Sequence, residues 1–288
     1  MRSQWECLQQ NIGIWHGAFL QFSPEGAQVK ETPSILTLKE TEPDQTIELI
    51  LEREPDDGPK KVNRLTFNAP GPAPATYFFE EGSFSQGASQ WSAFGQFPTE
   101  FSLKVGDRRV RFVVMYESTQ RYTSQVKYVT LICETQTDGT QFVDDRLTAT
   151  QLAGSCEGTA TVLDSRTGDF LMGESHWHFD DELSLVSKEQ FSEGEHSLVM
   201  SGLRMSGAHA SETCLVLQPK TDNELVYQLM LLPKGAYCLL PQEIKREKAF
   251  RIEVGWVSED GARSRFIRYY DTRGVWTNSA LISDSLKS

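Results

Sequence analysis

Two arginine pairs are the residues of this sequence best suited to bind an anionic group. Arg109 and Arg111 lie near the end of the first half of the chain, and Arg263 and Arg265 near the end of the second. In a β-strand, a spacing of two places both guanidinium groups on one face, and guanidinium groups bind carboxylates bidentately. The pairs predict a carboxylate site at a barrel mouth, a solvated outer face, or an arginine packed over a tryptophan at a barrel floor. The exposed face is favoured, because charged strand residues are mostly exposed.

Arg268 differs from these pairs because it shares a strand face with the aromatic residues Phe266 and Tyr270. Aromatic walls supply contact area, and a cation among them orients an acidic group. Val114 occupies the equivalent place in the first half, so the sequence predicts that the second half carries the ligand site. The predicted ligand contacts are Trp256, Phe266, Arg268, Tyr270 and Trp276, with Tyr227 completing the wall.

A possible metal-binding pattern occurs at His176 and His178, which share one face of a strand. This spacing suits chelation, and Asp180 and Asp181 follow, but no third ligand is evident nearby. The simpler interpretation places two exposed imidazoles on either side of an inward-facing Trp177. We therefore expect no metal site.

Sequence motifs of enzyme chemistry are missing. The chain contains no Gly-x-Ser-x-Gly, no Gly-x-x-x-x-Gly-Lys and no Gly-x-Gly-x-x-Gly. The sequence by itself therefore identifies no catalytic residue, and whether the protein is an enzyme stays open.

Charge and composition limit the partners of the chain. Its 288 residues include 28 basic and 40 acidic ones, a net charge of −12, of which residues 1–150 and 151–288 carry −6 each. Such a surface repels phosphate backbones and anionic lipids, so neither nucleic acid nor membrane insertion is expected. No apolar run is long enough to span a bilayer, and the N-terminus lacks the apolar core of a signal peptide. With five widely spaced cysteines, which we expect as buried reduced thiols, this composition predicts a cytoplasmic protein.

Alternation of apolar and polar residues dominates the chain and predicts an almost entirely β structure. Ser3 and Glu6 form a capping box that predicts one short N-terminal helix. Three prolines make residues 68–74 a loop, because proline cannot donate to a sheet ladder. Strands are expected over residues 18–22, 35–38, 46–51, 109–116 and 126–132.

An internal repeat divides the chain into two domains. The motif Gly13-Ile-Trp-His-Gly17 aligns with Gly154-Ser-Cys-Glu-Gly158, and residues 109–118 align with 263–272. We expect Gly17 to correspond to Gly158 and Arg111 to Arg265, all in strands. The predicted fold is all-β, with two tandem antiparallel β-barrels related by internal duplication, residues 1–150 and 151–288, and little helix.

These motifs also resemble a known family. Gly13-x-Trp15-x-Gly17, with an arginine on a late strand, resembles the calycin pattern of lipocalins. Nearly the whole chain is similar to a largely uncharacterised cyanobacterial and plastid family of paired calycin barrels, distantly related to bilin lyases. The similar segments are Trp15-His-Gly-Ala-Phe19, Phe22-Ser-Pro-Glu-Gly26, Phe250-x-x-Glu253-x-Gly255-Trp256, Arg265-x-x-Arg268-x-Tyr270-Asp271 and Gly274-x-Trp276. The second copy departs from the pattern, since Cys156 stands where Trp15 stands in the first.

Three functions remain open. The first is binding of a lipophilic, acid-bearing small molecule, such as a tetrapyrrole, a carotenoid-like or a fatty-acid-like compound, in a barrel pocket. The second is an enzyme that uses the same pocket, either a bilin lyase with a phycobiliprotein as partner or an isomerase or cyclase. The third is a structural or assembly protein with plugged barrels. A lined cavity favours the first two functions, and filled barrels favour the third.

Overall fold

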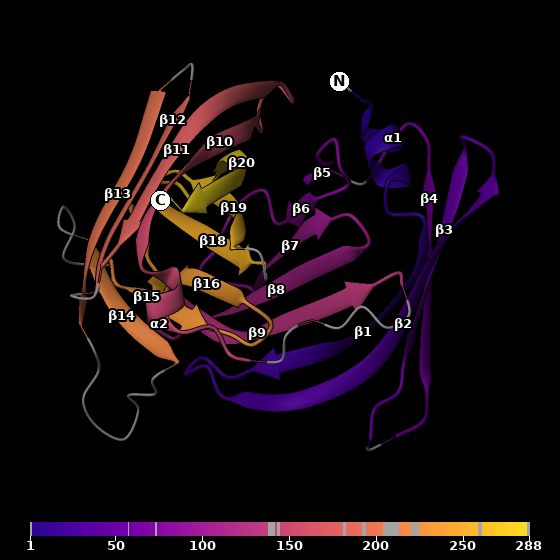
Figure 1. The fold of residues 1–288 in the computed structure, drawn as a ribbon, viewed down its shortest axis with the longest axis horizontal. Coiled ribbons are helices and arrows are strands. Elements are labelled where there is room, and N and C mark those ends of the chain that lie inside the picture. Colours follow the sequence, from indigo (N-terminus) through magenta and orange to yellow (C-terminus); the bar gives the residue numbers. More distant parts are fainter. Residues whose placement is uncertain are drawn as a thin grey trace.

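The chain folds into two curled antiparallel β-sheets that lie against each other (Figure 1). The first half, indigo to magenta in Figure 1, forms one sheet, and the second half, ending in yellow, forms the other. This computed structural model describes residues 2–56, 58–72, 74–137, 142, 145–180, 183–191, 194–203, 213–219, 225–258 and 261–286. The all-β prediction of two tandem barrel-like halves is confirmed.

The sheet of the first half is curled but not closed by hydrogen bonds in the described part of the chain. Its strands run in the order β4-β3-β2-β1-β9-β8-β7-β6-β5, so β4 and β5 are its ends. The predicted helix is present as α1 (Gln4–Gln9), with Ser3 as N-cap and the capping box complete. The strands are β1 (Gly13–Phe22), β2 (Gln28–Glu42), β3 (Thr46–Arg53), β4 (Lys61–Asn68), β5 (Thr76–Phe78), β6 (Phe84–Gly87), β7 (Phe97–Val105), β8 (Arg108–Ser118) and β9 (Ser124–Thr135).

The second half forms a closed barrel of ten strands in a simple meander. The short helix α2 (Ala149–Leu152) precedes it and lies between β9 and β10 in the chain. One two-residue strand, β17 (Glu243–Ile244), pairs with β9 of the first half. The barrel strands are β10 (Gly154–Asp164), β11 (Phe170–Phe179), β12 (Ser184–Phe191), β13 (Gly194–Leu203), β14 (Cys214–Pro219), β15 (Tyr227–Leu231), β16 (Ala236–Pro241), β18 (Phe250–Val257), β19 (Ala262–Tyr270) and β20 (Trp276–Leu286).

The strand registers of the two halves match, as internal duplication predicts. Gly17 in β1 lies opposite Glu134 in β9, and Gly158 in β10 lies opposite Asp284 in β20. A Cβ atom at either glycine would lie 2.1 or 2.2 Å from a backbone oxygen of the neighbouring strand. The close approach of two strands therefore requires glycine at both positions, which explains why this part of the repeat can be recognised in the sequence.

The two halves meet through the apolar faces of their late strands. Phe97 of β7 lies 5.3 Å from Tyr270 and 6.1 Å from Phe250, measured between ring centroids. Tyr116 of β8 donates a hydrogen bond of 2.7 Å to the carbonyl oxygen of Pro241. One hydrophobic cluster runs through both halves. Because this apolar face packs outside each curl, the polar face of the same strands is turned into the curl.

Two further expectations concern the state of the cysteines and the length of the helices. All five cysteines are among the described residues, all are buried, and no disulfide joins them. Burial raises the pKa of the Cys214 thiol to about 11, which keeps it protonated at neutral pH. Within the described residues, no helix has the length and apolar character of a membrane span.

Candidate functional site

Five of the six predicted ligand contacts are buried on the outer face of the second barrel. The ring of Phe266 lies 5.1 Å from Phe79 of the first half, and the ring of Trp276 lies 5.6 Å from Tyr77. Trp256 and Tyr270 lie on the same outer face and belong to the same hydrophobic cluster. The structure thus places all five against the first half rather than inside the barrel. Trp256 lies six residues along β18 from Phe250, the partner of Tyr270, and lines a separate cavity of about 380 Å³. Ligand contact by these residues stays a prediction.

Arg268 is fully buried between the two halves. Its guanidinium carbon lies 4.1 Å from the centroid of a Trp276 ring, and Nη1 donates a 3.1 Å hydrogen bond to Oγ of Ser85. Nε and Nη2 have no hydrogen-bond partner among the described residues. Burial lowers the pKa of this guanidinium, and Tyr270 partly opposes the shift. Arg268 therefore connects the two halves through its hydrogen bond to Ser85 and packs on Trp276 of its own half through a cation–π contact.

Tyr227, the sixth predicted contact, lies inside the second barrel. Its hydroxyl oxygen accepts a 3.2 Å hydrogen bond from the backbone nitrogen of Arg251. Arg251 in turn belongs to a group of charged side chains that fills this part of the barrel interior. The barrel interior is therefore a different environment from the aromatic face that carries the other five residues.

The predicted arginine pair of the second half lies at the centre of this charged interior. Nε of Arg263 lies 2.7 Å from Oδ1 of Asp284, and Nε of Arg265 lies 2.9 Å from Oδ2 of the same carboxylate. Nη1 of Arg265 also contacts Oε1 of Glu253 at 3.1 Å, and Nη2 donates to Oγ of Ser175. These side chains are buried, so the expectation of a solvated face is wrong here.

A further ion pair crosses the whole barrel. Nη1 of Arg251 on β18 contacts Oε2 of Glu189 on β12 at 3.0 Å. In the ten-strand barrel, β12 and β18 are five places apart in either direction, so these strands face each other across the interior. Arg265 and Tyr269 reach the same carboxylate at 3.4 and 3.1 Å. Ion-paired side chains therefore bridge the barrel at this level.

Charge balance makes this interior stable. Three arginines, at 251, 263 and 265, face three carboxylates, at 189, 253 and 284, and all six side chains are at most 5% exposed. Burial by itself lowers the pKa of Arg265, but Glu253 and Asp284 outweigh it and hold that pKa well above its usual value. Burial raises the pKa of Asp284, but Arg265 and Arg263 outweigh it and leave that pKa below its usual value. Each of the three arginines therefore has at least one carboxylate partner within the barrel.

In both halves an arginine packs over a tryptophan, as the third interpretation of the pairs predicts. The guanidinium of Arg109 lies 4.2 Å from the centroid of the Trp15 ring, and that of Arg263 lies 3.8 Å from Trp177. Trp177 is directly opposite Cys156, the residue that replaces the tryptophan in the second copy. The neighbouring strand thus supplies the ring that the repeat position lacks.

The first half repeats the core of the ion network. Nη2 of Arg109 lies 2.7 Å from Oε2 of Glu134, and Nη2 of Arg111 lies 2.6 Å from Oε1 of Glu100. Nη1 of Arg109 also donates a 3.0 Å hydrogen bond to Oδ1 of Asn11, next to α1. The expectation of an exposed face is therefore wrong for Arg109 and Arg111 as well.

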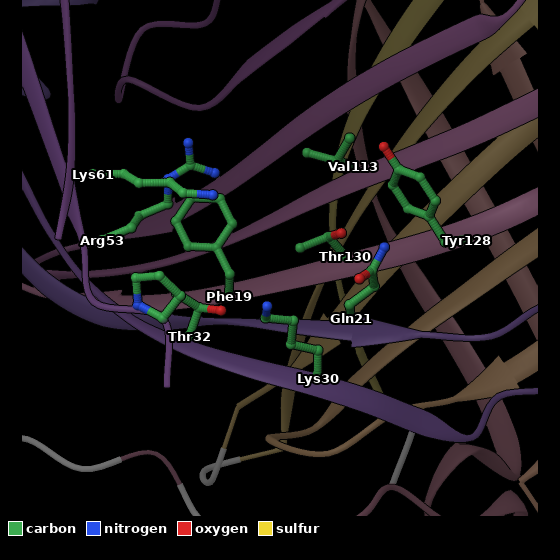
Figure 2. A pocket seen from close by; sticks show the side chains of 10 residues that line it. Phe19, Gln21, Lys30, Thr32, Arg53, Lys61, Val113, Tyr128 and Thr130 are labelled. Carbon is green, nitrogen blue, oxygen red and sulfur yellow. The ribbon is translucent and has the colours of Figure 1, made fainter. Parts of the chain in front are cut away.

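Beyond this network, the concave side of the first half is hollow (Figure 2). The cavity measures about 320 Å³ and lies between β1, β2, β3, β4, β8 and β9. In Figure 2 the side chains of Arg53 and Lys61 lie beside the ring of Phe19, with Gln21 and Thr130 farther along the hollow. The sequence reasoning missed this cavity, because its residues are spread along the chain from Phe19 to Thr130 and form no motif.

The histidine pair lies on the outside of the second barrel. His176 is half-exposed and its Nδ1 lies 3.2 Å from Oε1 of Glu157, while His178 bonds Oγ of Ser155 at 2.8 Å. Trp177 between them faces inward and is buried. Among the described residues, no three histidine, cysteine, aspartate or glutamate side chains gather as a metal site. Asp181 lies outside the described residues.

Comparisons with known proteins agree with this two-part architecture. Residues 1–139 match the N-terminal domain of the DUF3598 family, a domain of unknown function. Residues 144–286 match the C-terminal domain of "Biogenesis factor required for ATP synthase 1". A crystal structure of a DUF3598 protein of unknown function from Nostoc punctiforme is similar over 100% of both chains, with 28% identity and a TM-score of 0.80. No curated protein matches the chain.

Proposed function

We propose that this protein is an assembly factor that binds other proteins and uses its second barrel as a rigid body. The observation that supports this proposal most is the pairing of Arg251 with Glu189 across the barrel, at 3.0 Å between directly opposite strands. A ligand that entered at this level would have to separate buried ions, and uncompensated buried charges cost several kcal/mol each, roughly. The plugged-barrel alternative is therefore the function that the geometry favours.

The similarity of the second half to an ATP synthase biogenesis factor suggests the target. The matched region, residues 144–286, covers the whole of the closed barrel. We infer that the protein holds a subunit of ATP synthase, or a partly assembled group of subunits, before the complete enzyme forms. In the second barrel, the enzyme alternatives, a bilin lyase or an isomerase or cyclase, lose support for the same reason as ligand binding there.

We also propose that the resemblance to calycins reflects common architecture in the first half. The contact of Arg109 with Trp15, at 4.2 Å, joins the late strand to the opening motif and supports this proposal. Such a relationship concerns the fold and carries no activity with it.

The proposal is tested in the organism that carries the gene and with purified components. Deletion of the gene should lower the amount of assembled ATP synthase, measured by native gel electrophoresis, while the unassembled subunits accumulate. The purified chain should bind at least one isolated ATP synthase subunit and release it on assembly. An acidic protein of similar size serves as the control for non-specific binding. Normal ATP synthase levels in the deletion strain, with no binding to any isolated subunit, would refute the assembly function.

A further inference from the structure

The hollow of the first half has the properties of a ligand site, and this inference does not depend on the assembly function. We propose that the hollow binds a small organic anion, with a carboxylate or phosphate head group and a flat apolar body. Its volume of about 320 Å³ lies at the lower end of the range for small-molecule pockets. The argument rests on the charge of the hollow and on its comparison with the same layer of the second barrel.

The charge of the hollow is opposite to that of the protein. Lys30, Arg53 and Lys61 line it, and none of the ten described lining residues is acidic, although the chain as a whole carries −12. The guanidinium of Arg53 lies 5.6 Å from the centroid of Phe19 and donates through Nη2 to Asn63 at 3.0 Å. Its Nε is buried and has no hydrogen-bond partner among the described residues. A buried donor of this kind costs free energy unless a ligand or a water molecule accepts a hydrogen bond from it.

The strand registers show which residue of the second barrel corresponds to Arg53. Gly17 pairs with Ser34 and Ser34 with Arg53. In the second barrel, Gly158 pairs with Ser175 and Ser175 with Glu189. Arg53 therefore stands at the position of the glutamate that receives the cross-barrel ion pair.

The partner position has changed as well. In β18, Arg251 pairs with Tyr269, four residues beyond Arg265. In β7, Pro98 pairs with Met115, four residues beyond Arg111. Proline thus replaces the arginine that crosses the second barrel. The first half therefore lacks the pair that bridges the second barrel, and it has a cation, Arg53, at the position of the glutamate.

The layer beneath this position is polar in the first half and apolar in the second. Gln21 pairs with Thr130 in the hollow, and the equivalent pair in the second barrel is Val162 with Ala280. The two residues of the second barrel are fully buried in a small apolar cluster. Folding alone does not require the polar pair, because the duplicated copy packs this layer without polar groups. An amide and a hydroxyl facing a cationic cavity are suited to hydrogen-bond an anionic ligand.

Phe19 supplies the apolar contact. It lines the hollow where the second barrel has the small Ala160. An aromatic ring beside cations stacks on the flat body of a ligand while the cations hold its charged head group. This combination favours an anion with an apolar body over inorganic phosphate, and over a neutral lipid.

Two matched dyes test the proposal. Anilinonaphthalene sulfonate has a flat apolar body and an anionic head group, and phenylnaphthylamine has the same rings without the charge. The purified chain should bind the sulfonate with a fluorescence increase that weakens as salt is added, and should bind the neutral dye at least tenfold more weakly. Double replacement, Arg53→Gln with Lys61→Gln, should weaken sulfonate binding by about tenfold or more, the effect of losing charge-assisted hydrogen bonds.

Lys60→Gln is the matched control, because Lys60 adjoins Lys61 but pairs with Glu52 at 2.8 Å outside the hollow. It should leave binding within about twofold of the original. Displacement of the dye by phenyl phosphate or by phenylacetate identifies the head group and supports the site. Cooperative thermal unfolding of each variant, followed by circular dichroism, confirms that the dye reports on folded protein. Equal losses in the control and the double variant, equal binding of the two dyes, or no displacement by either competitor would overturn the proposal.

Discussion

The two halves of this protein share one ion network but differ in what fills their curl. Arg109, Arg111, Glu100 and Glu134 of the first half occupy the positions of Arg263, Arg265, Glu253 and Asp284 in the second. Among the described residues, the second half adds the pair Arg251 and Glu189, and its sheet, unlike that of the first half, closes into a hydrogen-bonded barrel. The comparison shows that one additional buried pair distinguishes an interior bridged by side chains from one that is hollow.

Removal of Arg265 should produce the largest effect and separate the two networks most clearly. Arg265→Met leaves three buried carboxylates with less compensation, so we expect a loss of about 3–5 kcal/mol in the free energy of unfolding. Arg111→Met in the first half should cost less than half as much, because Arg111 and Glu100 are 12% and 14% exposed, so water can reach Glu100, and Glu134 keeps its ion pair with Arg109. Denaturant unfolding followed by tryptophan fluorescence measures both values. Equal losses would contradict the difference between the halves.

The pair across the barrel is tested by a double-mutant cycle. Arg251→Gln and Glu189→Gln should each destabilise the protein, and the double variant should be more stable than the sum of the two changes predicts. We expect a coupling energy of about 1–3 kcal/mol, because the two side chains are buried and share partners. A coupling energy near zero would show that the interior is bridged in some other way.

Acid should affect the closed barrel through Asp284. The pKa of this carboxyl is lower in the folded chain than its ordinary value of 3.8, because Arg265 and Arg263 outweigh the opposite effect of burial. Its ionised form therefore stabilises the fold above about pH 4, and that contribution disappears as the pH falls from there through the folded-state pKa. Unfolding curves between pH 7 and pH 2 should show this loss. Asp284→Asn should be less stable at pH 7 and should show a flatter acid limb; an unchanged acid limb would exclude this contribution.

Arg268 should give the smallest effect despite its complete burial. It has a hydrogen bond to Ser85 and a contact with the Trp276 ring, and within the described residues it forms no ion pair with a carboxylate. Arg268→Met loses these contacts and also avoids burying a charge, so we expect a change in the free energy of unfolding within about 1 kcal/mol. The loss measured for Arg265→Met serves as the internal reference for this variant. A loss as large as that of Arg265→Met would mean that Arg268 holds the two halves together by more than these contacts.

Several features of the fold were predictable because they depend on neighbours in sequence or on one local requirement. Alternation predicted the strands, and the capping box at Ser3 and Glu6 predicted α1. Gly17 and Gly158 marked the duplication, because a side chain at either position would collide with the adjacent strand. Burial of the cysteines followed from their ordinary preference for interiors.

The candidate site was harder to predict, because alternation separates two faces of a strand without saying which one is inside. In β19, Arg263 and Arg265 occupy one face, and Phe266 and Tyr270 the other. An isolated sheet would expose the charged face to water. Here the aromatic face is covered by the first half, so the charged face is turned into the barrel, where carboxylates from distant strands neutralise it.

The sequence alone determined the β architecture and the existence of two copies, since both depend on local periodicity and on residues that contact adjacent strands. Tertiary structure decided where ion pairs bridge the interior and where, among the described residues, a hollow remains. Arg53 lies opposite Ser34 in the first copy, and Glu189 lies opposite Ser175 in the second. The effect of this difference in charge depends on the side chains that face the position in the folded sheet, and those come from distant strands. Electrostatic compensation in a barrel depends on residues that are far apart in the chain, and for that reason no short motif records it.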